Sequence, residues 1–167
     1  MRLFIVRHAI AEERGKKFYP NDDRPLTKDG IKKMKANVKG MSAFLPSSFT
    51  VVTSPLKRAF ATAEIIASQN SSDIAVAPDD GLLPDDKAND IIQTLKKYED
   101  HPTVVLVGHE PSLGRFLSFV LQQKSGSILV KKGSVICIDY STEQPNRSTL
   151  LFSIPPKILR MIAPKKR

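Results

Sequence analysis

Short apolar runs alternate with stretches of helical periodicity along most of this chain of 167 residues. The clearest runs are LFIV at 3–6, FTVV at 49–52 and VVLV at 104–107, and each precedes a segment in which apolar residues recur every three or four positions. A continuous apolar run of this length is typical of a strand that is buried on both faces of a parallel sheet. We therefore predict an α/β fold of three layers, α/β/α, with a largely parallel central sheet.

The first helical segment and the C-terminal part extend this prediction. Residues 27–45 contain Ile31 and four later apolar residues at helical spacing, behind a potential N-cap at Thr27. Near the C-terminal end, VICIDY at 135–140 and TLLFSI at 149–154 are separated by a polar stretch. This pattern predicts an antiparallel hairpin at the edge of the sheet, followed by a short final helix.

Length and composition indicate one folded unit. With 41% hydrophobic residues and no linker or repeat, residues 1–167 are expected to form a single domain that ends in a basic tail at 164–167. The single cysteine, Cys137, argues against a disulfide framework and fits a reducing compartment. No apolar run is long enough to span a membrane, and the run at 3–6 is too short for a secretory signal. We therefore expect a cytoplasmic protein without a membrane partner.

The chain is basic, with 26 Lys and Arg against 17 Asp and Glu and a formal net charge of +9. Such an excess favours an anionic substrate or partner, although solubility alone also accounts for it. Nucleic acid is not the expected partner. The chain has no Trp, only three Tyr, and no basic stripe interleaved with aromatic residues.

Polar side chains follow each of the three clearest strands at the point where the strand ends. Arg7 and His8 follow the first strand, Ser54 and then Arg58 follow the second, and His109 follows the third. Because ligands of open α/β sheets bind beyond the carboxyl ends of parallel strands, these side chains are expected to share one site. Arg58 would reach that site because side chains in the first turn of a helix lean toward its N-terminus.

Two arginines and two histidines suit a phosphate better than a metal ion. Guanidinium groups bind phosphate through paired N–H donors, whereas they would repel a metal cation. Helix N-termini, such as the one predicted near Ser54, add backbone donors. Arg24, in the loop before the first helix, is a further candidate for substrate binding. We expect phosphate or sulfate to occupy the site, and we expect neither a metal nor a cofactor.

Four sequence motifs carry a family resemblance. They are LFIVRHA at 3–9, DDRPLTKDG at 22–30, TSPLKRAFATAEI at 53–65 and VVLVGHEPSL at 104–113. In this order and spacing, the chain resembles the histidine phosphatase superfamily, which has the phosphoglycerate-mutase-like fold. The short length and the RHA and RPLT sequences are most similar to the SixA-type phosphohistidine phosphatases.

The resemblance implies a role for each matching residue. His8 would be the nucleophile that takes the phosphoryl group as a transient phosphohistidine, and Arg7, Arg58 and His109 would hold the phosphoryl oxygens. Elementary chemistry agrees with these roles. Phosphoryl transfer depends chiefly on positioning and on positive groups around the equatorial oxygens, and a neutral imidazole is a competent nucleophile near neutral pH.

The general acid is the least defined part of the predicted site. Many members of the superfamily use a carboxyl group in the loop after the third strand, where this chain has PDDGLLPDDKAND at 78–90. Asp85 is the first candidate and Asp86 the second, and both residues also suit a turn or a helix start. A phosphohistidine substrate needs a strong acid less, because imidazole is a far better leaving group than an alkoxide.

The leading hypothesis is a metal-independent phosphatase that acts on phosphohistidine of a signalling or phosphotransfer protein. A compact chain without an inserted cap would leave a shallow, basic mouth that suits a protein substrate. Two alternatives remain open at this stage: a phosphatase for small phosphate esters, and a domain that binds a phosphoanion or nucleic acid without catalysis.

Overall fold

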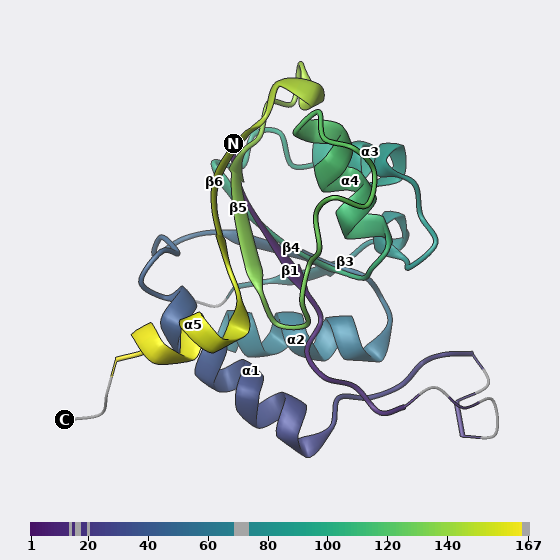
Figure 1. Ribbon diagram of the computed structural model, residues 1–167, viewed down its shortest axis with the longest axis vertical. Coiled ribbons are helices and arrows are strands. Elements are labelled where there is room, and N and C mark those ends of the chain that lie inside the picture. Colours follow the sequence, from purple (N-terminus) through teal and green to yellow (C-terminus); the bar gives the residue numbers. More distant parts are fainter. Residues whose placement is uncertain (14, 16–17, 20, 69–73, 165–167) are drawn as a thin grey trace.

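The computed structural model describes residues 1–13, 15, 18–19, 21–68 and 74–164. In these residues, six strands form one sheet in the order β3-β2-β4-β1-β5-β6 (Figure 1). The strands are β1 (Arg2–Arg7), β2 (Thr50–Thr53), β3 (Val76–Pro78), β4 (Thr103–Gly108), β5 (Val135–Asp139) and β6 (Thr149–Ile154). Of the predicted basic tail at 164–167, only Pro164 is described, and the rest lies outside the described residues.

The sheet is parallel on one side and antiparallel on the other. Strands β3, β2, β4 and β1 run parallel to one another. Strand β5 pairs antiparallel with β1, and β6 pairs antiparallel with β5. The predicted parallel core and C-terminal hairpin are therefore confirmed.

Helices cover both faces of the sheet, which confirms the three-layer architecture (Figure 1). One layer contains α1 (Lys28–Met41), α2 (Lys57–Ser68) and α5 (Pro156–Ile162), and the other contains α3 (Ala88–Lys96) and α4 (Ser112–Val120). Short 3-10 helices lie at Asp80–Leu82 (η1) and Pro145–Arg147 (η2). Among the described residues, none of the helices combines the length and the apolar character needed to cross a membrane.

The continuous apolar run of β1 has a direct structural cause. Phe4 and Val6 pack against the side of the sheet covered by α1 and α2, whereas Leu3 and Ile5 pack against the side covered by α3 and α4. Successive side chains of a strand point to opposite faces, so a strand in the middle layer needs an apolar residue at every position.

Helix α1 differs from the prediction in which of its faces is buried. Met34, Val38 and Met41 are buried as expected, but Ile31 is 37% exposed. The buried face instead includes Gly30, where a Cβ atom would collide with the carbonyl oxygen of Ile10. A glycine at this position lets the helix approach the segment that leaves β1, and this close approach helps to fix the backbone next to the site.

Candidate active site

Strand pairing brings two of the predicted site residues together. Strands β1 and β4 are neighbours, with Arg7 paired to Gly108, and the backbone N–H of His8 donates to the carbonyl of Gly108 at 3.1 Å. His8 and His109 therefore leave adjacent strands at the same level of the sheet. Their ring centroids lie 5.0 Å apart, with the ring planes inclined by 54°.

Two arginines reach the same place from different segments and share one acidic residue. Arg58, in the first turn of α2, is only 1% exposed, and its Nη1 and Nη2 donate to the carbonyl and Oδ2 of Asp22 at 2.6 and 3.1 Å. Arg24 donates from Nε to Oδ1 of Asp22 at 2.7 Å and from Nη1 to the carbonyl of Glu12. Asp22 thus holds both guanidinium groups in fixed orientations.

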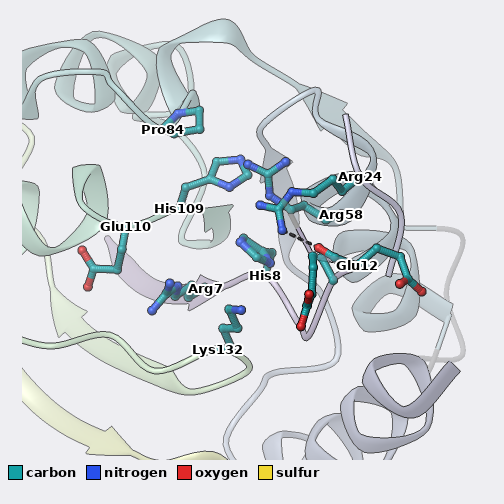
Figure 2. Close-up of a pocket in the computed structure, with 11 residues that line it drawn as sticks. Arg7, His8, Glu12, Arg24, Arg58, Pro84, His109, Glu110 and Lys132 are labelled. Atoms are coloured by element: carbon teal, nitrogen blue, oxygen red, sulfur yellow. Dashed lines mark hydrogen bonds between the residues drawn. The ribbon is translucent and has the colours of Figure 1, made fainter. Parts of the chain in front are cut away.

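These side chains surround one cavity of about 610 Å³ (Figure 2). Five of the predicted site residues line it: Arg7, His8, Arg24, Arg58 and His109. The remaining lining residues are Ala11, Glu12, Glu13, Pro84, Glu110 and Lys132. Such a concentration of guanidinium groups is suited to an anion with several oxygens. Within the described part of the chain, no group of three or more His, Cys, Asp or Glu side chains is placed to hold a metal ion.

The surroundings of His8 define the state of its ring. Nδ1 lies 2.7 Å from the carbonyl oxygen of Ala9. A carbonyl can only accept, so Nδ1 carries the proton and Nε2 keeps a lone pair. Burial lowers the pKa of His8 to about 3. The hydrogen bond to Ala9 acts in the opposite direction and raises this pKa, whereas the charges of Arg58, Arg7 and Lys132 lower it further. The ring is therefore neutral at physiological pH and has an available nucleophilic nitrogen.

His109 is held from behind by a serine. Its Nε2 lies 2.8 Å from Oγ of Ser54, and that Oγ also accepts the N–H of Leu56 at 3.4 Å. The serine hydroxyl can then donate its hydrogen to Nε2, so the ring proton of His109 is on Nδ1. This Nδ1 has no hydrogen-bond partner among the described residues. Burial, followed by the charges of His8 and the arginines, lowers the pKa of His109 to about 2.

Ser54 therefore occupies a different position from the one expected of a substrate-binding residue. It is fully buried and does not line the cavity, because its side chain lies behind His109. Its geometry suits the orientation of His109 rather than direct contact with a substrate.

The structure does not bring Asp85 into the cavity. The backbone turns at this point, with the N–H of Asp86 donating to the carbonyl of Leu83, and Pro84 is the residue of this turn that lines the cavity. Asp85 is exposed, and neither it nor Asp86 is a lining residue. Burial raises the pKa of Asp86, but that carboxyl group is also outside the cavity lining. The assignment of the general acid to Asp85 or Asp86 stays a prediction.

Glu110 and Lys132 are lining residues that the sequence analysis did not identify. The Glu110 carboxylate accepts the backbone N–H of Val130 at 2.8 Å and that of Gly114 at 3.2 Å. Its position directly after His109 was a signal for Glu110. Lys132 follows α4 in a segment without a motif, so only the folded structure shows that it faces the site.

Fold, cavity and sequence comparison define the class of protein. The sequence model of the histidine phosphatase superfamily (branch 1) matches residues 3–83, which include α1, α2 and all of β1 except Arg2. The chain belongs to the histidine phosphatase superfamily, and this membership supports phosphatase activity.

Individual relatives add detail to this classification. An uncharacterized protein of Picosynechococcus sp. is 32% identical over 141 residues, which cover 81% of this chain and 83% of that protein. The structure of the protein histidine phosphatase SixA complexed with tungstate has a TM-score of 0.81, with 18% identity over 95% of this chain and 99% of that one. An α-ribazole phosphatase from Shigella flexneri has a TM-score of 0.73, with 17% identity over 93% of this chain and 97% of that one.

Proposed function

We propose that this chain is a phosphatase that removes the phosphoryl group from phosphohistidine of a signalling or phosphotransfer protein, through a phosphohistidine intermediate on His8. The observation that carries the proposal is the state of His8. Its ring is neutral, its Nδ1–H is bound to the Ala9 carbonyl, and its Nε2 lone pair is left for a cavity lined by arginines.

In the first step, the Nε2 lone pair of His8 attacks phosphorus as the bond between phosphorus and the leaving nitrogen breaks. The electron pair of that bond stays on the leaving imidazole, which takes a proton from solvent. Arg7, Arg58 and the Nδ1–H of His109 stabilise the charge on the three transferring oxygens. Because these groups already supply positive charge, the proposed step requires no metal ion.

In the second step, a water oxygen attacks the phosphorus on His8. The P–N bond breaks, its electron pair returns to Nε2, and the proton of the water passes to solvent. Inorganic phosphate leaves, and the hydrogen bond from Nδ1 to Ala9 restores the starting tautomer. One water is consumed for each phosphoryl group.

The carboxyl groups that follow β3 and β4 favour a leaving group that needs little protonation, and Glu12 and Glu13 are the remaining carboxyl groups of the cavity lining. Asp85 is exposed and outside the lining, and the Glu110 carboxylate is occupied by two backbone N–H groups that it accepts. An alkoxide leaving group depends on a general acid, whereas an imidazole leaving group depends on one much less. The fold is also similar to that of a protein whose structure is described as the protein histidine phosphatase SixA.

A comparison of four substrates tests this proposal. Initial rates are measured on a phosphohistidine-containing phosphotransfer protein, phosphoramidate, an aryl phosphate and an alkyl phosphate. We expect kcat/KM to be highest for the phosphohistidine protein and lowest for the alkyl phosphate. We also expect an acid-labile, alkali-stable phosphoenzyme in the wild type and none in His8→Ala. A labelled His8→Ala variant at the wild-type level would refute the mechanism.

The same comparison distinguishes the other possible functions. A higher kcat/KM for the alkyl phosphate than for the phosphohistidine protein would assign the chain to small phosphate esters. Binding of phosphate without turnover of any substrate would show a binding domain instead of an enzyme.

A further inference from the structure

The segment from Val130 to Ser134 is tied to the site by hydrogen bonds on both sides. The backbone N–H of Val130 donates to Glu110 at 2.8 Å, and its carbonyl accepts from Nη1 of Arg7 at 2.9 Å. The N–H of Gly133 donates to the carbonyl of Arg7 at 2.9 Å, and its carbonyl accepts from Asn37 at 3.0 Å. The position of Lys132, between these two anchored residues, is therefore fixed at the level of the backbone.

Gly133 has a conformation that this arrangement requires. Its φ is +72°, a left-handed backbone that L side chains rarely adopt, and a Cβ atom there would lie 2.7 Å from Nδ2 of Asn37. The sharp turn leaves Lys132 on the side of the segment that faces the cavity. Figure 2 shows its side chain pointing toward His8, on the side opposite Arg24 and Arg58.

The ammonium of Lys132 differs from the guanidinium groups around it. Arg24 and Arg58 are bound to Asp22, whereas Lys132 makes no hydrogen bond or ion pair with the described residues. Partial desolvation of the ammonium, and then the charges of Arg7, Arg24 and Arg58, lower the pKa of Lys132, although the residue as a whole is exposed. Positive charges held close together repel one another, and a bound dianionic phosphoryl group would relieve that repulsion.

We propose that Lys132 is a further catalytic residue, whose ammonium contacts a phosphoryl oxygen on the side of His8 opposite Arg58. This inference rests on the proposed function, because it assigns Lys132 to the phosphoryl group that His8 attacks. It completes a ring of positive groups around the transferring oxygens, with Arg7 and Lys132 on one side and Arg24 and Arg58 on the other. Lys132 is exposed to solvent, so its long side chain can move onto the substrate without breaking an existing ion pair.

Three variants test this role: Lys132→Met, Lys132→Arg and Lys131→Met. Lys131 is the matched control, because it is the adjacent exposed lysine, carries the same charge and does not line the cavity. Three quantities are measured for each variant: the Kd for inorganic phosphate by calorimetry, and kcat and KM with phosphoramidate. Thermal unfolding of each variant reports whether it is folded.

We expect Lys132→Met to lower kcat/KM and phosphate affinity by on the order of tenfold to a hundredfold. This loss is smaller than the loss expected on removal of a buried donor, because Lys132 is exposed. Lys132→Arg should recover most of both losses, and Lys131→Met should stay within about twofold of the wild type. Equal values for Lys132→Met and Lys131→Met would overturn the proposal. The phosphate Kd keeps this test separate from the proposed function, because a binding measurement needs no turnover. If the wild type binds phosphate but hydrolyses no substrate, that result contradicts the enzyme assignment and leaves the contact between Lys132 and phosphate to be decided by the Kd values.

Discussion

Acidification should destabilise this protein in the pH range between the unfolded and the folded pKa values of its two buried histidines. His8 and His109 are 4% and 1% exposed, and their pKa values are lowered from 6.5 to about 3 and about 2. In the unfolded chain both rings bind a proton below pH 6.5, whereas in the folded protein they remain neutral down to the lowered values. Because the unfolded state binds more protons, the free energy of unfolding falls as the pH falls through this window.

The size of the effect follows from the distance between the working pH and the ordinary histidine pKa of about 6.5. At about pH 5 that distance gives about 2 kcal/mol for each histidine, or about 4 kcal/mol for the pair, relative to about pH 7.5. Such a loss is a large fraction of the roughly 5–15 kcal/mol by which a folded domain is typically stable. Asp23 and Asp79, whose pKa values lie below 3.8, do not titrate in this window.

Urea unfolding at several pH values between about 5 and about 7.5 measures this dependence. The double variant His8→Asn/His109→Asn should lose most of the slope, because neither asparagine titrates. His101→Gln is the control, since His101 is exposed and lies at the opposite end of β4 from the site, and it should keep the slope. A wild-type loss of less than about 1 kcal/mol, or a full slope in the double variant, would refute the reasoning about the buried rings.

Three further outcomes are expected at the site. Arg58→Ala should lower kcat/KM on every substrate by on the order of 100- to 1000-fold, as for the loss of one buried transition-state donor, and full activity would contradict the phosphate site. Ser54→Ala should lower kcat by about tenfold or more with little change in the thermal midpoint, because His109 loses the partner that fixes its tautomer, and unchanged kinetics would remove Ser54 from the mechanism. Asp85→Asn should stay within about twofold of the wild type on phosphohistidine, aryl and alkyl substrates, and a loss confined to the alkyl phosphate would restore Asp85 as the general acid.

The parts of the fold that the sequence predicts well are those with a strong local signal. Strand β4 is buried at all six of its positions. A continuous apolar run of this kind predicts a strand inside a sheet that is covered on both faces. The buried face of α1 was less predictable. Ile31 fits the helical spacing, yet it is exposed because the close approach at Gly30 depends on the distant carbonyl of Ile10.

The candidate site shows the same division. Arg7, His8 and His109 line one cavity, and the sequence predicts this neighbourhood because strand ends share one edge of a parallel sheet. Asp85 was assigned by its position along the chain, but a turn puts Pro84 at the cavity instead. Lys132 has no local signal at all, since its approach depends on hydrogen bonds between its neighbours and residues far away in sequence.

The central position of β1 has a consequence for biosynthesis. Strand β1 is the earliest of these six strands along the chain and lies between β4 and β5, so both of its partners come from the second half of the chain. During translation its apolar residues have no sheet to join, and contacts of such long range form slowly. His8 likewise acquires His109 only when this pairing is complete. A chain that ends before β4 therefore lacks both partners of β1 and also lacks His109, so that closure of the sheet and assembly of the phosphate site are one event.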